Sequence, residues 1–203
     1  MDPQQKTNAV KSHFDRVASR YDLMNTILSF GLHHLWKRRA INLLGLKAGE
    51  RVIDVCGGTG DLALLAAPQV GPTGGVILYD FNRAMMLAGR PKVARAGLSE
   101  RIWLVEGDAE HLAAADQSLD AAVVGFGVRN LARMDEGVRE MHRVLKPGGR
   151  LVILEFSRPL NPLWRWLYDR YSFSVMPRLG QLIAGSREAY TYLITSIRQF
   201  PRP

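Results

Sequence analysis

The chain of 203 residues has the length of one domain, or of one domain with an appended lid. Hydrophobic residues make up 47% and charged residues 23% of the chain, which is an ordinary soluble composition with enough apolar residues for a sizeable core. The net charge of +8 and the pI of about 10.0 favour anionic partners, either nucleic acid or an anionic membrane surface.

Several classes of protein are disfavoured at once. The basic residues are spread along the chain, with one tight run at Lys37–Arg39, so we expect no nucleic-acid partner. No apolar run approaches the ~20 residues that span a bilayer, and the N-terminus lacks the apolar core of a signal peptide. Cys56 is the only cysteine, which excludes an intrachain disulfide and favours the cytoplasm. No metal-ligand cluster is found, so no metal is expected.

Residues 1–48 are predicted to form a helical cap or lid. An apolar stripe at helical spacing runs through Val10, Phe14, Val17 and Tyr21. After a break at Gly31, a second helix is predicted to bury six residues and to point Lys37–Arg39 mostly outward. The six are Leu32, Leu35, Trp36, Ala40, Leu43 and Leu44. A bare α/β core does not need these residues, so they form either a capping subdomain or a lid over the substrate.

Residues 49–157 are predicted to form an α/β core. Short apolar runs alternate with helical stretches, and the runs lie at 51–55, 76–80, 102–105, 119–125 and 150–156. Asn82 is expected to cap the helix after the second run, and residues 145–149 are expected to be a helix stop and turn. Such alternation indicates a Rossmann-like parallel sheet with helices on both faces. Ligands bind such sheets at the carboxyl ends of the strands. Asp54, Asp80, Asp108 and Gly125 all fall at such ends.

A glycine-rich turn, Cys56-Gly57-Gly58-Thr59-Gly60, follows the first strand directly. Glycines have no Cβ, so a ligand can lie on the backbone while the positive end of the next helix faces it. The spacing differs from the dinucleotide and P-loop patterns. Asp80, about twenty residues after the turn, ends the second strand, where an acid binds ribose hydroxyls. The sequence therefore predicts a nucleotide site here.

Residues 158–203 are predicted to be a helical substrate or lid region. Aromatic residues alternate with Arg165 and Arg170, and Ser186 is expected to cap a last helix. The aromatic residues are Trp164, Trp166, Tyr168 and Tyr171. They either pack inside the lid or lie at a membrane interface, where aromatic and cationic residues occur together. We therefore expect peripheral, salt-sensitive association with the inner face of the membrane.

The turn from Asp54 to Gly60, together with Asp80, resembles the nucleotide site of class I S-adenosylmethionine-dependent methyltransferases. Cys56 stands where that pattern often has glycine. The resemblance implies S-adenosyl-L-methionine as cofactor and a Rossmann-like sheet that usually ends in a β-hairpin, for which we find no pair of strands.

The same resemblance implies roles for individual residues in holding the cofactor. Asp80 binds the ribose, Thr59 and the backbone of Gly58 and Gly60 hold the methionine portion, and Asp108 with Ala109 holds the adenine edge. Gly125 stands where the family often has a serine, and Asp54 either orients the turn or touches the ligand.

Further stretches resemble the ubiquinone/menaquinone biosynthesis C-methyltransferases, of the demethylmenaquinone methyltransferase type. They are residues 14–25, 29–36, 126–130, 154–157 and 168–173. The resemblance runs from about Phe14 to Pro201, and the family's usual segment beyond that point is absent. It implies methyl transfer to a ring carbon of a polyprenylated quinol, either demethylmenaquinol or the benzoquinol precursor of ubiquinol.

A quinol carbon becomes nucleophilic when the neighbouring hydroxyl, a phenol with a pKa near ~10, loses its proton. By this reading Arg129 stabilises the phenolate, Asn130 orients the ring, Tyr21 and Asp22 complete the pocket with Asn25, and His33 or His34 is the base. Alternatives remain for each residue. Arg129 could anchor its loop, the histidines could be packing residues, and Tyr21–Asp22 could be a hinge.

Rival functions also remain open. The chain could bind the cofactor without catalysis, or it could methylate RNA or another small molecule. A dehydrogenase is disfavoured by the spacing of the glycines. The sequence does not decide between a naphthoquinol and a benzoquinol, nor whether the chain forms a homo-oligomer.

Overall fold

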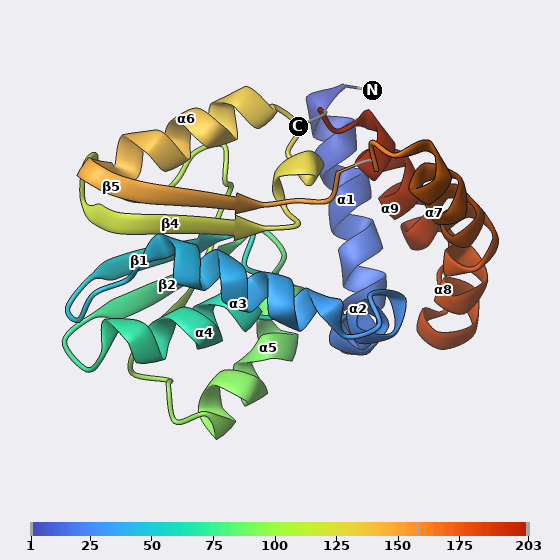
Figure 1. The fold of residues 1–203 in the computed structure, drawn as a ribbon. Coiled ribbons are helices and arrows are strands. Elements are labelled where there is room, and N and C mark those ends of the chain that lie inside the picture. The colour runs from blue at the N-terminus through green and yellow to red at the C-terminus, as the bar shows by residue number, and fades with distance from the viewer. Residues whose placement is uncertain (1, 158, 202–203) are drawn as a thin grey trace.

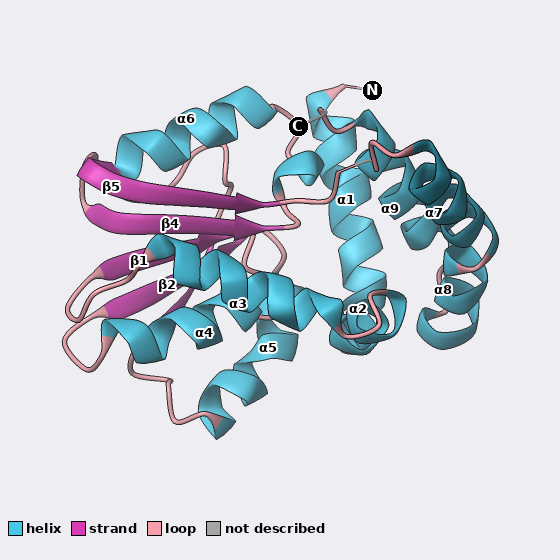
Figure 2. Ribbon diagram, viewed as in Figure 1, coloured by secondary structure: helices cyan, strands magenta, loops and turns pink. Residues whose placement is uncertain are grey.

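The computed structural model describes residues 2–157 and 159–201. Five parallel strands form one sheet in the order β3-β2-β1-β4-β5. Figures 1 and 2 show this sheet between two layers of helices. The strands are β1 (Arg51–Val55), β2 (Gly75–Asp80), β3 (Ile102–Glu106), β4 (Leu119–Gly125) and β5 (Leu145–Leu154). The strand order reverses between β1 and β4, which is where doubly wound sheets bind ligands.

Helices cover both faces of the sheet, which confirms the predicted Rossmann-like fold. One face packs against α3 (Leu32–Leu44), α4 (Asp61–Val70) and α5 (Arg83–Arg95). The other packs against α6 (Met134–Val144) and the loop after β3. Alternate residues of β1 enter the two cores, since Val52 joins the first and Ile53 the second.

The remaining helices lie beyond the carboxyl ends of the strands (Figure 1). We call α1 (Pro3–Val17), the turn Ala18–Arg20 and α2 (Tyr21–Leu28) the lid helices. They pack against α8 (Met176–Ala184) and α9 (Arg187–Gln199) around a third core that contains Val17, Met24 and Tyr190. The helix α7 (Pro162–Ser174) packs against α8 and α9. Among the described residues, three helices and no further strand follow β5. The division of the chain at residues 48 and 158 stays a prediction.

The predicted inward face of α3 was right for Ala40 and Leu44, which are buried, and wrong for Leu32, Leu35 and Leu43, which are exposed. Leu35 and Leu43 are 60% and 67% exposed, while Lys37, predicted to point outward, is 6% exposed. The buried residues of α3 are His33, Lys37, Ala40, Ile41 and Leu44. They share one face at helical spacing. Lys37 tolerates burial because its ammonium donates to Asp61 Oδ2 at 2.7 Å.

The start of β5 also differs from the prediction. The sequence 145–149 was expected to be a turn, but it belongs to the strand, whose pairing with β4 is irregular between Leu119 and Ala121. Between Leu145 and Arg150, β5 has more residues than the facing part of β4, and this bulge takes up the extra residues. The two predicted helix caps are confirmed, since Asn82 and Ser186 accept hydrogen bonds from Met85 N and Ala189 N.

Candidate functional site

The glycine-rich turn connects β1 to α4 in a left-handed backbone conformation. Gly60 has φ +82°, and a Cβ there would lie 2.6 Å from Leu78 Cδ1, so this position needs glycine. Gly60 N donates to Gly57 O at 2.9 Å, and α4 begins at the next residue. The start of α4 therefore points its free N–H groups toward the carboxyl edge of the sheet.

Asp54, at the end of β1, stabilises this turn through a hydrogen bond to α4. Its side chain is fully buried, and Oδ2 accepts a hydrogen bond from Ala63 N in the first turn of α4 at 2.9 Å. Burial raises the pKa of this carboxyl to about 7. Its Oδ1 has no partner among the described residues. The contact fits the turn-orienting alternative for Asp54, and its contact with a ligand stays a prediction.

Asp80 lies at the carboxyl end of β2 and is held by the backbone on both sides. Its Oδ2 accepts from Gly58 N at 2.8 Å and its Oδ1 from Asn82 N at 2.7 Å. Burial raises its pKa to about 6, against these two hydrogen bonds. A carboxylate has about four acceptor sites, so two remain for the hydroxyl groups of a ribose. Asp80 thus fits the role that the sequence predicts.

A narrow cleft of about 50 Å³ runs beside Asp80. Gly58, Asp80 and Gly125 line it from the core, and Phe14 and Tyr21 line it from the lid helices. The residues suit a nucleoside: a carboxylate for hydroxyls, glycines for close backbone contact and Met85 for a flat apolar group. The cleft is nevertheless too narrow for a nucleoside, because a volume of about 50 Å³ holds only a few water molecules.

The other predicted cofactor residues lie near this cleft but do not line it. Asp108 Oδ1 accepts from Glu110 N at 2.8 Å and closes the turn after β3. Ala109 is buried against the α6 side of the sheet. Thr59 is buried, and its hydroxyl points away from the cleft toward α2, as described below. The structure thus brings Gly58, Asp80 and Gly125 together, and the roles of all eight predicted cofactor residues stay predictions.

A second and much larger cavity, about 520 Å³, lies between the lid helices, the C-terminal helices and the end of the sheet. Its lining is mainly aromatic and aliphatic, with a few polar groups. The predicted residues among the lining are Tyr21, Asn25, His33, Arg129 and Asn130. Phe14, Tyr21, Phe126 and Asn130 line both the cavity and the cleft, so these four side chains form a shared wall.

Arg129 lies in the wall of the cavity and is 8% exposed. Its guanidinium donates to Phe126 O at 2.6 Å and forms an ion pair with the buried Glu155. The neighbouring Asn130 donates to Phe126 O and accepts from the Tyr192 hydroxyl at 3.2 Å. Arg129 therefore anchors its loop, as one alternative holds, and Glu155 balances its charge. The Nε of Arg129 has no hydrogen-bond partner among the described residues.

His33 reaches the cavity from α3 and is 2% exposed. Its Nε2 lies 3.1 Å from Thr26 Oγ1, and its Nδ1 has no partner among the described residues. Burial, together with the charge of Lys37 and the adjacent His34, lowers its pKa to about 4. His33 is therefore neutral near pH 7 and a weak base there, and its catalytic role stays a prediction.

Two further residues, His13 and Tyr192, line the cavity without having been predicted from the sequence. Their rings stack with centroids 5.2 Å apart, and burial lowers the pKa of His13. The Nδ1 of His13 is buried without a partner among the described residues. A signal existed for His13, because it lies at helical spacing between Val10 and Val17 on the inward face of α1.

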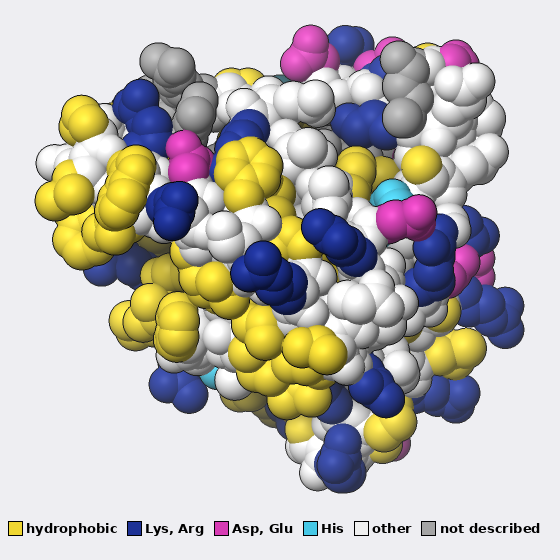
Figure 3. Space-filling view, turned by 90° about the vertical axis from the view of Figure 1, so that its right-hand side faces the viewer, with side chains coloured by type: hydrophobic (Ala, Val, Ile, Leu, Met, Phe, Trp, Pro, Cys, Tyr) yellow, Lys and Arg dark blue, Asp and Glu magenta, His cyan; other side chains and the backbone are white. Residues whose placement is uncertain are grey.

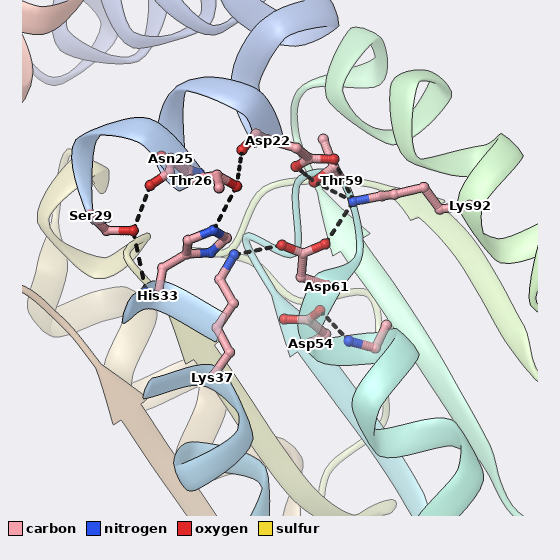
Figure 4. Close-up of polar contacts among 11 residues, drawn as sticks. Asp22, Asn25, Thr26, Ser29, His33, Lys37, Asp54, Thr59, Asp61 and Lys92 are labelled. Atoms are coloured by element: carbon pink, nitrogen blue, oxygen red, sulfur yellow. Dashed lines mark hydrogen bonds and ion pairs between the residues drawn. The ribbon is translucent and has the colours of Figure 1, made fainter. Parts of the chain in front are cut away.

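Asp22, predicted to complete the pocket, lies outside the lining of both spaces. Its carboxylate instead points into a polar cluster with Thr59, Lys92 and Asp61 (Figure 4). Among the described residues no group of side chains is arranged to hold a metal ion. The structure therefore separates Asp22 from the other predicted catalytic residues.

Comparison with known proteins agrees with these features. Residues 2–203 match the model of the ubiE/COQ5 methyltransferase family. A Pseudomonas putida protein named ubiquinone/menaquinone biosynthesis C-methyltransferase UbiE is 49% identical over 97% of this chain and 77% of its own length. A protein of the same name from Pseudomonas fluorescens is 48% identical over the same shares.

Solved structures with similar folds are more distant in sequence. A putative S-adenosyl-L-methionine-dependent methyltransferase from Methanococcus maripaludis is 21% identical, with a TM-score of 0.63 over 91% of this chain and 83% of that protein. The [4+2]-cyclase SpnF is 19% identical, with a TM-score of 0.60 over 80% of this chain and 76% of that protein. A fold shared with a cyclase does not by itself fix a reaction. The family model and the close relatives do fix the family, and the chain belongs to the ubiE/COQ5 methyltransferase family.

Proposed function

We propose that this chain transfers a methyl group from S-adenosylmethionine to a ring carbon of a polyprenylated quinol. The predicted methyltransferase class is confirmed by the family match. The observation that carries the finer proposal is the shared wall, since polar residues that suit a nucleoside lie on one side of it and a large apolar cavity lies on the other. Cofactor and acceptor can then meet beside Phe14, Tyr21, Phe126 and Asn130, where direct contact between the methyl group and the ring carbon allows in-line transfer.

The bound cofactor supplies an electrophilic methyl group, so the protein's own residues have to orient the ring and remove its hydroxyl proton. The flat ring of a quinol fits between the aromatic side chains of the cavity, near the stacked pair Phe126 and Phe156. Arg129 favours a phenolate at this end of the cavity, although Glu155 reduces its effect. His13 and His33 are the two neutral bases that face the cavity.

The size and polarity of the cavity support a quinol rather than a more polar acceptor. Its volume of about 520 Å³ falls in the usual range of small-molecule pockets, and a ring with the first part of a prenyl chain fills such a space. Nothing in it resembles a polyanion site, which a nucleic-acid substrate would need. The distinction between a naphthoquinol and a benzoquinol stays open.

Transfer of labelled methyl from S-adenosylmethionine tests this proposal. The acceptors are demethylmenaquinol and the methoxybenzoquinol precursor of ubiquinone, both chemically reduced. We expect label in at least one quinol and none in the matching oxidised quinones, which lack the hydroxyl. Binding of S-adenosylhomocysteine without transfer to either acceptor would instead support the inactive, cofactor-binding alternative.

A polyprenyl tail is itself a membrane component, and the outer face of the C-terminal helices suits a membrane. Figure 3 shows apolar side chains gathered on this face, interspersed with Lys and Arg. The exposed apolar residues of α7 include Leu163, Trp164, Trp166 and Phe173, and Trp164 also lines the cavity. None of the helices among residues 2–157 and 159–201 is long and apolar enough to cross a membrane. We therefore propose peripheral docking on an anionic bilayer.

Flotation with anionic vesicles tests this docking. We expect the protein to float at low salt and to be released as salt screens its basic residues. Replacing Leu163, which is 64% exposed on α7, with aspartate should reduce the floated fraction by at least about threefold, because a charge replaces an inserted apolar group. Leu87→Asp is the matched control, since Leu87 is 50% exposed on α5, and it should float like the wild type. Equal flotation of the two variants would contradict the docking face.

A further inference from the structure

Five charged and polar side chains connect the lid to the glycine-rich turn (Figure 4). The ammonium of Lys92 on α5 lies at the centre, 2.7 Å from Asp22 Oδ2 on α2 and 2.6 Å from Asp61 Oδ1 at the start of α4. It also donates to Thr59 Oγ1 at 3.1 Å, and the same hydroxyl donates to Asp22 Oδ1 at 2.6 Å. Lys37 completes the cluster from α3. The side chain of Thr59 is therefore fixed by groups outside the cofactor cleft.

The cluster is buried at one end and accessible to water at the other. The side chains of Lys37 and Asp61 are 7% and 20% exposed, and those of Lys92 and Asp22 are 22% and 40% exposed. Burial alone would raise the pKa of Asp61, but Lys37 and Lys92 together hold it at about 2. Asp61 therefore stays ionised near neutral pH and pairs with Lys37 where little water has access, whereas the carboxylate of Asp22 is open to water.

The small volume of the cleft beside the cluster implies that the lid helices move when the cofactor enters. Phe14 and Tyr21 narrow the cleft to about 50 Å³, which is too small for a nucleoside. Tyr21 is adjacent in sequence to Asp22 on α2, so α2 cannot withdraw Tyr21 from the cleft without moving Asp22 away from Lys92 and Thr59. Cofactor entry and the integrity of the Asp22 contacts are therefore linked.

We propose that Asp22 and Lys92 form a releasable clasp, which opens to admit the cofactor and closes to position Thr59 in the glycine-rich turn. The clasp rests on the proposed function, because it acts on the cofactor cleft. Breaking the contact between Asp22 and Lys92 leaves no unpaired charge in the protein interior. Lys92 remains paired with Asp61, and the partly exposed carboxylate of Asp22 is solvated by water. When the clasp opens, the Thr59 hydroxyl loses Asp22 Oδ1, the acceptor of its hydrogen bond. Asp22 and Lys92 are thus positioning residues rather than catalytic ones.

The test is the dissociation rate of S-adenosylhomocysteine, measured by stopped-flow displacement. Asp22→Asn keeps an oxygen that accepts from Thr59 but removes the charge that faces Lys92. We expect dissociation to accelerate about fivefold, the effect of losing one partly exposed ion pair, with the unfolding temperature nearly unchanged. Added salt should accelerate dissociation from the wild type and have little effect on the variant.

A second variant and a control separate the clasp from general effects of charge. Lys92→Gln should accelerate dissociation at least as much, since it also removes the Lys92–Asp61 pair. The double variant should be no faster than Lys92→Gln alone, because that change already breaks the contact with Asp22. Lys146→Met removes a different ion pair, Lys146–Asp120 at 2.6 Å, and should leave the rate unchanged. Wild-type rates in Asp22→Asn and Lys92→Gln would overturn the clasp. Failure of the wild type to bind S-adenosylhomocysteine at all would instead overturn the proposed function.

Discussion

The variant Arg129→Met is expected to lose about 3–5 kcal/mol of unfolding free energy and nearly all methyl transfer. The stability loss follows from burial, because the side chain of Glu155 is 4% exposed and its charge would remain without a cation. Phe126 O would also lose the donor that now lies 2.6 Å away. Chemical denaturation and the labelled-methyl assay measure the two losses separately.

A double variant separates the structural role of Arg129 from its catalytic role. Arg129→Met/Glu155→Met replaces the buried ion pair with two apolar side chains of similar length, a change that is often neutral for stability. We expect the double variant to regain most of the lost stability while methyl transfer stays absent. Recovery of transfer together with stability would show that Arg129 only anchors its loop and does not act on the quinol.

The second large effect is expected from Gly89→Ala, which should weaken S-adenosylhomocysteine binding by at least about tenfold. Gly89 lies on α5, and a Cβ there would meet the backbone oxygen of Thr59 at 2.4 Å. A backbone atom cannot rotate aside, so α5 and the glycine-rich turn must separate. Overpacking of this kind costs about 1–3 kcal/mol, which outweighs the ~1 kcal/mol that alanine gains in a helix. Isothermal titration measures the affinity.

Gly137→Ala is the matched control for this prediction. It is also a helical glycine, and its added Cβ would meet Leu131 Cδ1 at 2.4 Å. That atom is the end of a flexible side chain and can move aside. We therefore expect Gly137→Ala to bind S-adenosylhomocysteine like the wild type. Equal affinities for both variants would contradict the close approach of α5 to the turn.

The sequence predicted the features that depend on neighbouring residues. Apolar runs predicted the five strands, and the side chains of Asn82 and Ser186 predicted two helix starts. Asp80 was located from its place at the end of a strand, because strand ends in parallel sheets meet at one edge. Each of these signals lies within a few residues of the feature that it predicts.

The features that were not predicted depend on contacts between distant parts of the chain. Lys37 is buried because Asp61, 24 residues away, neutralises it, and spacing on α3 cannot reveal that partner. The ion pair between Arg129 and Glu155 joins residues that are 26 positions apart in the sequence. The large cavity forms only where α1 meets the C-terminal helices, so His13 and Tyr192 had no common signal in the sequence.

The most direct test of the account is to fill the cavity while leaving the cleft intact. Ala189 lines the cavity from α9 and does not line the cleft, so Ala189→Trp should fill part of the space that the quinol needs. We predict that this variant binds S-adenosylhomocysteine with wild-type affinity and transfers less than about one-tenth of the labelled methyl, since the large cavity is the acceptor site. Undiminished transfer to the reduced quinol in a folded variant would contradict the assignment of this cavity to the substrate.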